Sequence, residues 1–243
     1  MTYCAGLLLN DGVVLAADTR TNAGLDNIAT FSKMRIWERP GDRVIVLLSA
    51  GNLAVSQAVA TLLDERADAE APEGETLYTA TSMFQVARLV GGVVREVRSI
   101  DGEALEANSE SFSASFLLAG QIKGGQVRLF QVYAAGNFIE AMEDTPFLQI
   151  GEHKYGKPIL DRVANMDMAP AEAAKLLLLS FDSTLRSNLS VGMPIDLMIY
   201  RKGALKVELK RRYEADDAYF RKISESWSDA LRTSFASVPD FEI

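Results

Sequence analysis

The sequence has 243 residues, of which 48% are hydrophobic and 24% are charged, and its formal net charge is −8. The length allows one large domain or two small ones, and the composition is that of a folded globular protein rather than a disordered one. The negative charge argues against a nucleic-acid partner, because an acidic surface repels phosphate groups.

The chain is predicted to open with a β-hairpin. Apolar residues fill positions 3–9 and 13–17, and the intervening Asn10-Asp11-Gly12 tolerates the positive φ angles of a tight turn. Residues 18–32 are polar and small, which predicts a loop. Two further strands are expected over residues 33–39 and 43–49, since both are rich in bulky apolar residues.

Helical spacing marks the next two elements. Apolar residues share one face over residues 55–62 and again over residues 83–97. The acidic segment 68–75 between them contains Pro72 and Gly74, which predicts a loop too short to be a domain boundary.

Strands and helices alternate in the rest of the chain. The expected strands cover residues 112–120, 126–133, 138–142, 147–150, 195–199 and 205–210, and the expected helices cover 154–164 and 171–185. A last helix places one apolar stripe along its length, and we expect this stripe to pack on the core rather than form a subunit interface; its members are Phe220, Ile223, Trp227, Leu231 and Phe235. The element order predicts an α+β fold, in which two stacked antiparallel sheets lie between outer helices. We expect one domain over residues 1–243, with a helical extension from about residue 214.

Three residues near the start form a candidate catalytic group. Thr2 begins the strand whose hairpin partner ends at Asp18, and Lys33 enters a later strand, so a sheet can gather all three at one edge. Singly, each has a plainer interpretation: a surface hydroxyl, a turn cap and a solvated charge.

Together the three residues have the chemistry that catalysis by an N-terminal threonine requires. A threonine hydroxyl needs a base to take its proton, and an N-terminal threonine carries one in its α-amino group, with an ordinary pKa of about 7.7–8.0. A lysine ammonium nearby lowers that pKa, and Asp18 would hold Lys33 charged and oriented. This mechanism requires removal of Met1, because an amide nitrogen is no base.

An oxyanion donor is expected at the turn of residues 49–52, which joins a strand to a helix. The Gly51 N–H lies where backbone can approach a substrate closely. The alternative is a plain strand-to-helix turn.

These segments resemble a known family. Residues 17–24, 33–36, 49–51 and 190–196 are similar to the catalytic aspartate, catalytic lysine, oxyanion and late-turn segments of proteasome β-subunits and their bacterial relatives. The resemblance implies a four-layer αββα sandwich of the N-terminal-nucleophile hydrolase type. It also implies a threonine peptidase that acts on peptides or unfolded proteins within a homo-oligomer, either a ring or an open helical ring.

The resemblance also implies roles for single residues. Thr2 would be the nucleophile, supported by Asp18, Lys33 and Ser190. Arg20, two residues after Asp18, and Ser187, three residues before Ser190, are further candidates for supporting residues. Backbone at Thr21 and Asn22 would pair with an extended peptide, and Ser49 and Leu53 would line the pocket for the side chain before the cut.

Two positions depart from the family pattern. Where the family has an aspartate three residues before its serine, this chain has Ser187, followed by Asn188. Where the family has a serine after the glycine that matches Gly151, this chain has Glu152. Both family residues tune the N-terminal amine, so the replacements favour an alternative: an assembly scaffold with weak or absent chemistry. A related amidohydrolase acting on small amides or isopeptides is a further alternative.

Other classes of site are disfavoured. One cysteine and one histidine, Cys4 and His153, can form neither a disulfide nor a Cys/His zinc site, and a catalytic dyad of the two is disfavoured because Cys4 lies in an apolar strand. No Walker loop, dinucleotide fingerprint or Gly-x-Ser-x-Gly elbow occurs, so neither a metal nor a cofactor is expected. No apolar run approaches the ~20 residues that span a bilayer. With a single cysteine, this indicates a cytoplasmic protein that has no membrane partner.

Overall fold

The computed structural model describes residues 2–22, 28–67 and 72–242. Within these ranges, no helix is long and apolar enough to cross a membrane. Met1, whose removal the catalytic prediction requires, lies outside the described residues.

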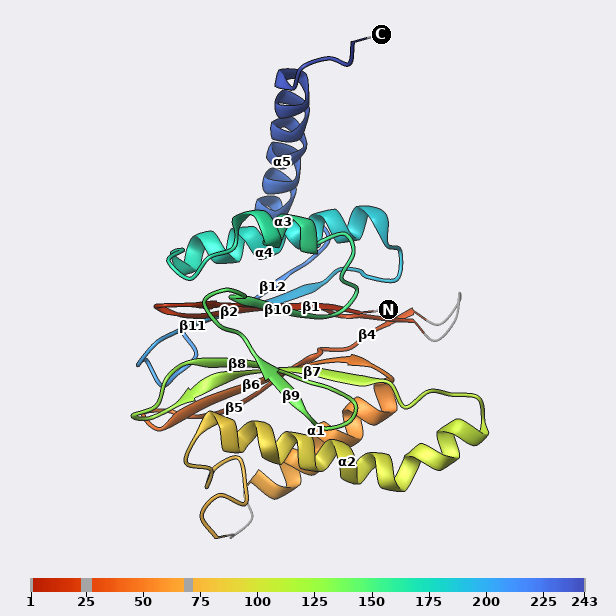
Figure 1. The fold of residues 1–243 in the computed structure, drawn as a ribbon, viewed down its shortest axis with the longest axis vertical. Helices are drawn as coiled ribbons and strands as arrows, with labels where there is room; N and C mark the ends of the chain where they lie inside the picture. Colours follow the sequence, from red (N-terminus) through yellow and green to blue (C-terminus); the bar gives the residue numbers. More distant parts are fainter. Residues whose placement is uncertain (1, 23–27, 68–71, 243) are drawn as a thin grey trace.

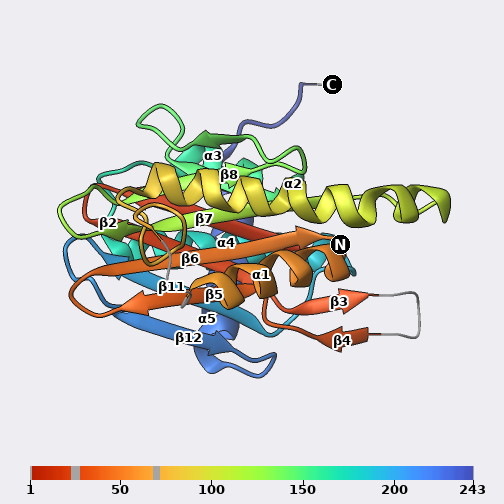
Figure 2. The same ribbon diagram turned by 90° about the horizontal axis from the view of Figure 1, so that it is seen from below.

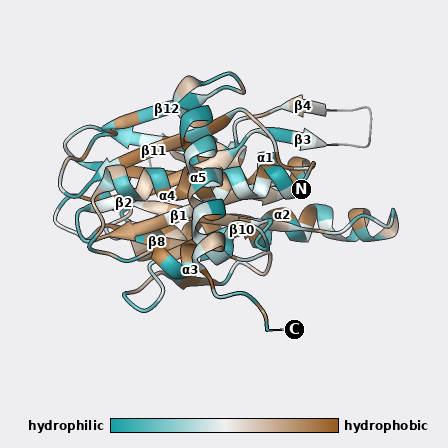
Figure 3. Ribbon diagram, turned by 90° about the horizontal axis from the view of Figure 1, so that it is seen from above, coloured by the Kyte–Doolittle hydropathy of each residue, from teal (hydrophilic) through white to brown (hydrophobic). Residues whose placement is uncertain are grey.

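Five antiparallel strands form the first sheet. They are β1 (Tyr3–Leu9), β2 (Gly12–Asp18), β10 (Phe147–Gly151), β11 (Ile195–Arg201) and β12 (Leu209–Tyr213). Their order across the sheet is β10-β1-β2-β11-β12, so the predicted opening hairpin lies at its centre. Figure 3 shows β1 and β11 largely hydrophobic and β12 hydrophilic, as expected of central and edge strands.

The second sheet is also antiparallel, and its strand order follows the sequence. It consists of β5 (Met34–Arg39), β6 (Arg43–Gly51), β7 (Ala114–Ile122), β8 (Arg128–Val132) and β9 (Phe138–Glu140). A separate two-stranded ribbon is formed by β3 (Arg20–Asn22) and β4 (Ile28–Thr30).

Helices cover the outer faces of both sheets. The second sheet is covered by α1 (Leu53–Ala67) and α2 (Met83–Ala107), and the first by α3 (Lys157–Val163) and α4 (Pro170–Ser187) (Figures 1 and 2). The four layers confirm the predicted αββα sandwich. The fifth helix, α5 (Ala218–Ser237), projects away from the layers (Figure 1).

Three hydrophobic layers hold the sandwich together. The alternation of side chains along β1 explains how one strand serves two of them. Tyr3, Ala5 and Leu7 pack towards α3 and α4, whereas Cys4 and Leu8 pack between the sheets. The third layer lies between the second sheet and the helices α1 and α2.

Three sequence predictions need correction. The segment 18–32 was expected to be a loop, but it contains β3 and β4. The strand expected over residues 205–210 begins only at Leu209, and Leu205, with a φ of 46°, is outside the extended region. The apolar stripe of α5 was expected to pack on the core, which holds for the buried Phe220 but is wrong for the later turns. Leu231 is 51% exposed and Phe235 82% exposed.

Candidate active site

The candidate site lies at one end of the sandwich, where β1 starts, β2 ends and the chain enters β5. Thr2 is half-buried immediately before β1, and its carbonyl oxygen accepts a hydrogen bond of 2.6 Å from the Glu152 N–H. Gly151 makes this approach possible: its φ is +82°, and a Cβ there would lie 2.0 Å from the Thr2 oxygen. Backbone from β10 therefore fixes the start of β1.

Asp18 connects the start of β1 to Lys33. Its Oδ1 accepts hydrogen bonds from the Tyr3 N–H at 3.0 Å and from the Lys33 ammonium at 2.6 Å. Its Oδ2 accepts a longer bond of 3.3 Å from the Gly192 N–H. The carboxyl is fully buried, and this burial raises its pKa above the ordinary value, although the Lys33 charge offsets part of the effect.

Lys33 lies immediately before β5, and its ammonium is enclosed by acceptors. Besides Asp18, it donates to the Arg20 carbonyl at 2.7 Å, and its side chain is only 4% exposed. The Lys33 carbonyl accepts a bond of 3.1 Å from the Ser49 N–H, which aligns the end of β6 beside it. The hairpin brings Asp18 to the start of β1 as predicted, where it accepts the N–H of Tyr3 next to Thr2. The expectation that one sheet gathers all three residues is wrong for Lys33, because β5 belongs to the second sheet and it is the stacking of the two sheets that brings Lys33 to Asp18.

The late turn that contains Ser190 is anchored next to this group. The Ser190 N–H donates to Asn188 Oδ1 at 2.9 Å, and the Arg20 guanidinium donates to the Leu189 carbonyl at 2.8 Å. Through Gly192, the same turn contacts Asp18. Arg20 and Ser190 therefore lie in one hydrogen-bonded region with the Lys33–Asp18 pair.

The two departures from the family pattern occupy different environments. Ser187 is exposed in the last turn of α4, so it is the neighbouring Asn188 that reaches the site. Asn188 is buried and donates from Nδ2 to Glu152 Oε2 at 2.6 Å. Sequence reasoning named Glu152 and Asn188 but did not foresee that they pair, because 36 residues separate them.

Gly51 ends β6, close to Lys33 through the Ser49–Lys33 contact. Its φ is +108°, and a Cβ there would lie 2.2 Å from the Ser113 carbonyl oxygen, so only glycine fits without strain. Directly after it, Asn52 begins the approach to α1, with Oδ1 accepting from the Ala54 N–H at 2.9 Å.

A pocket of about 350 Å³ opens beside Lys33. Ser49 and Leu53, predicted to bind substrate, both line it, together with Phe31 and Gln57. Thr21 lies in β3, where its hydroxyl donates to the Ala29 carbonyl at 3.0 Å. Asn22 ends the same strand.

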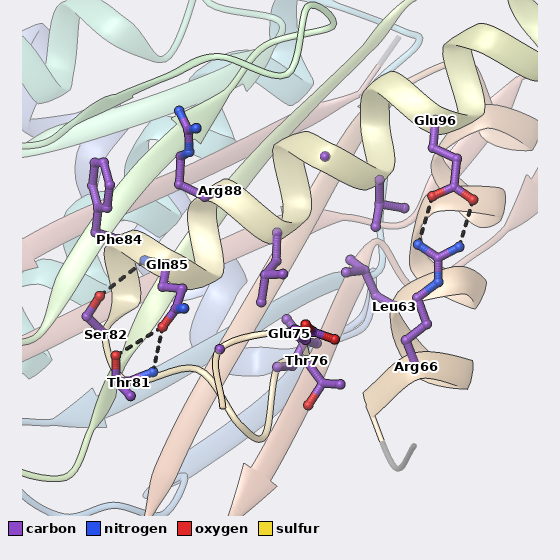
Figure 4. Close-up of a pocket in the computed structure, with 15 residues that line it drawn as sticks. Leu63, Arg66, Glu75, Thr76, Thr81, Ser82, Phe84, Gln85, Arg88 and Glu96 are labelled. Atoms are coloured by element: carbon purple, nitrogen blue, oxygen red, sulfur yellow. Dashed lines mark hydrogen bonds and ion pairs between the residues drawn. The ribbon is translucent and has the colours of Figure 1, made fainter. Parts of the chain in front are cut away.

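A larger cavity of about 800 Å³ lies elsewhere, between α1, the segment before α2, and α2 itself (Figure 4). Arg66 and Glu96 form a bidentate ion pair across it, and Gln85 accepts hydrogen bonds from Thr81. None of the predicted site residues lines this cavity, so its size alone does not connect it with the candidate chemistry.

Cys4 and His153 do not resemble a catalytic dyad. Cys4 is fully buried between the sheets, and burial raises the pKa of its thiol, which keeps it protonated. His153 is exposed, and its Nδ1 lies 3.3 Å from the Gly151 carbonyl oxygen. Among the described residues, no cluster of three or more His, Cys, Asp or Glu side chains could hold a metal ion.

Comparison with known proteins agrees with this architecture. The family model described as "Proteasome subunit" matches residues 2–199. The chain belongs to the proteasome subunit family. A comparison with curated proteins gave no match.

Solved structures of the bacterial proteasome homologue Anbu resemble this proteasome-family chain over its whole length. Anbu from Hyphomicrobium sp. strain MC1 is 57% identical, with a TM-score of 0.92 and full coverage of both chains. Anbu from Yersinia bercovieri, described as an ancestral β-subunit, is 45% identical with a TM-score of 0.92, covering 100% of this chain and 99% of its own. A helical assembly of the Anbu complex from Pseudomonas aeruginosa is 45% identical with a TM-score of 0.93, covering 99% and 98%.

Proposed function

We propose that the chain is a threonine peptidase that cleaves extended peptides, with Thr2 as its N-terminal nucleophile after Met1 is removed. The observation that carries the proposal is the buried Lys33–Asp18 pair, which is hydrogen-bonded to the backbone next to Thr2. A buried ion pair is costly to form, so its position beside Thr2, the candidate nucleophile, favours a catalytic purpose.

The proposed reaction has two steps. The Thr2 hydroxyl attacks the peptide carbonyl while its proton passes to the Thr2 amine, and that proton leaves with the departing amine of the substrate. The Lys33 ammonium lowers the pKa of the Thr2 amine, which increases its neutral fraction near pH 7. The Gly51 N–H would stabilise the oxyanion. Water then hydrolyses the threonine ester and regenerates the hydroxyl.

An unpaired strand edge next to the site favours a peptide substrate over a small amide. Within the described part of the chain, β3 pairs only with β4, so its other edge can accept a peptide strand at Thr21. The pocket lined by Ser49 and Leu53 has Lys33 in its wall, and it would receive the side chain before the cut.

Substitution of Thr2 tests the proposal. We expect the native chain to lose Met1 and to take up a β-lactone or epoxyketone at Thr2, whereas Thr2→Ala takes up none and keeps its melting temperature. Intact mass and peptide mapping measure both, and the exposed Thr81→Ala is the matched control. Equal labelling of Thr2→Ala, or retention of Met1 in the native chain, would exclude the mechanism.

We also propose that the chain forms a homo-oligomer through α5. Its later turns and the following segment present apolar side chains to solvent, with Leu231 51%, Phe235 82% and Phe241 90% exposed. Such a surface on a projecting helix is suited to a second copy of the chain, since large exposed apolar patches usually mark interfaces. The helical assembly of the Pseudomonas relative is consistent with this.

The oligomer is tested by sedimentation. We expect Leu231→Asp combined with Phe235→Asp to yield smaller particles than the native chain, with little change in melting temperature. Arg232→Glu on the same helix changes charge without removing apolar surface and should assemble normally. An unchanged sedimentation profile for the double variant would rule out α5 as the contact.

A further inference from the structure

Glu152 is a buried acid whose backbone and side chain make hydrogen bonds to different parts of the site. Its N–H donates to the Thr2 carbonyl, while its carboxylate turns towards other partners. Oε1 accepts from the N–H groups of His153 at 2.9 Å and Lys154 at 2.7 Å, and Oε2 accepts from Asn188 Nδ2 at 2.6 Å. Only 6% of the residue is exposed.

Asn188 links Glu152 to the turn of residues 188–192. Its Oδ1 accepts the Ser190 N–H, and at the far end of the turn the Gly192 N–H reaches Asp18 Oδ2. Glu152 and Asp18 therefore hold the same turn from opposite ends. Both residues also hold the start of β1. The Glu152 N–H donates to the Thr2 carbonyl, and Asp18 Oδ1 accepts the Tyr3 N–H.

Only one of the two side chains in the Glu152–Asn188 contact can carry a negative charge. A second carboxylate at position 188 would lie at about the 2.6 Å separation of the present bond and would repel the first. The proteasome pattern has its acid on the α4 side, three residues before the serine, and a neutral serine after the glycine. This chain has Ser187 at the position of that acid and carries its acid after Gly151 instead, where Glu152 contacts the neutral amide of the neighbouring Asn188.

Glu152 is equipped to stay ionised in this environment. Burial raises the pKa of its carboxyl, but the hydrogen bonds from the Lys154 N–H, the Asn188 amide and the His153 N–H lower it further, so the net pKa lies below the ordinary value. The site therefore contains a second buried anion besides Asp18.

We propose that Glu152 is a positioning residue of the Thr2 site, which fixes the Ser190 turn through Asn188 and supplies the negative charge that the proteasome pattern has on α4. The inference rests on the proposed function, since it assigns Glu152 a role towards the same nucleophile. It also gives Glu152, one of the two departures from the family pattern, an explanation: the acid lies on the β10 side of the Glu152–Asn188 contact instead of at the end of α4.

Moving the charge across the Glu152–Asn188 contact tests the inference. The three variants are Glu152→Gln, which removes the charge but keeps the shape, Asn188→Asp, which adds a second charge, and the double variant, which moves the single charge to position 188. The exposed Glu143→Gln is the matched control. Each chain is prepared with Thr2 as its first residue.

Two measurements are made on each chain. One is the pKa of the Thr2 amine, obtained from the pH dependence of carbamoylation by cyanate and mapped by mass spectrometry. The other is the rate of β-lactone addition at Thr2 at pH 7. The other groups that titrate or carry charge around the Thr2 amine and Glu152 are Asp18, Lys33, Tyr3, His153 and Lys154, and all variants leave them unchanged.

We expect Glu152→Gln to lower the pKa of the Thr2 amine by roughly half a unit or more, because a nearby anion favours the ammonium form. Asn188→Asp should slow lactone addition about tenfold or more, since repulsion displaces the Ser190 turn. The double variant should return to within about threefold of the native rate, because it restores one charge and one hydrogen bond.

Two results would overturn the inference: a Glu152→Gln amine pKa equal to that of Glu143→Gln, or a double variant no faster than Asn188→Asp. A purely structural role would lower the melting temperatures and leave the amine pKa unchanged, which also counts against it. If the native chain takes up no lactone, the proposed peptidase function fails, while the amine pKa values still decide the role of Glu152.

Discussion

Two ion pairs of nearly equal length have opposite surroundings in this protein. Lys33–Asp18 spans 2.6 Å with side chains 4% and 0% exposed, and Arg66–Glu96 spans 2.7 Å with side chains 45% and 39% exposed. The first joins β2 to the entry of β5 at the candidate site, and the second crosses the cavity between α1 and α2 (Figure 4). Burial, rather than bond length, decides how much the loss of one partner changes the free energy of unfolding.

Breaking the buried pair should have the largest effect. Lys33→Met leaves the Asp18 charge buried without its cation, and we expect a loss of about 3–5 kcal/mol in the free energy of unfolding. Under the proposed mechanism lactone addition at Thr2 should also cease, because the amine would lose the charge that is proposed to lower its pKa. Chemical denaturation and mass spectrometry measure the two effects.

The stability loss in Lys33→Met should depend on pH in a defined direction. Burial already raises the pKa of Asp18 in the folded protein above its unfolded value, and removal of the ammonium raises it further. Protonation then favours the folded state, so the deficit should shrink as the pH falls from 7 towards 5. A deficit that grows on acidification would contradict this account.

The matched control neutralises both partners. Lys33→Met combined with Asp18→Asn removes the uncompensated charge, so it should regain much of the lost stability while lactone addition stays absent. This result would separate the two roles, because stability would follow charge balance and reactivity would follow Lys33. A double variant as unstable as Lys33→Met would mean that the buried charge is not the cause.

Breaking the exposed pair should have the smallest effect. Arg66→Met is expected to change the free energy of unfolding by less than about 1 kcal/mol, because water replaces the lost partner. Lactone addition at Thr2 should be unchanged, since Arg66 lines a cavity that contains none of the predicted site residues. A loss of stability close to that of Lys33→Met would show that burial does not explain the difference between the two ion pairs.

The layered fold could be predicted because its signals are local. Asp11-Gly12 between apolar runs identified the central hairpin, and period-two and helical spacing identified most other elements. The errors arose where tertiary contacts decide the outcome. Within the described residues, the segment after Asp18 forms short strands by pairing with itself, and the late turns of α5 have the pattern of a core helix although Leu231 and Phe235 are exposed.

The sequence by itself determined which groups can meet at the end of the hairpin, since strand pairing brings Asp18 to the start of β1 whatever lies elsewhere. Only the tertiary structure decided that Glu152 faces Asn188 and that Ser187 faces solvent. The reason is physical: hairpin geometry is fixed by neighbouring residues, whereas contact between the end of β10 and the end of α4 depends on how helix and sheet pack across 36 residues of chain.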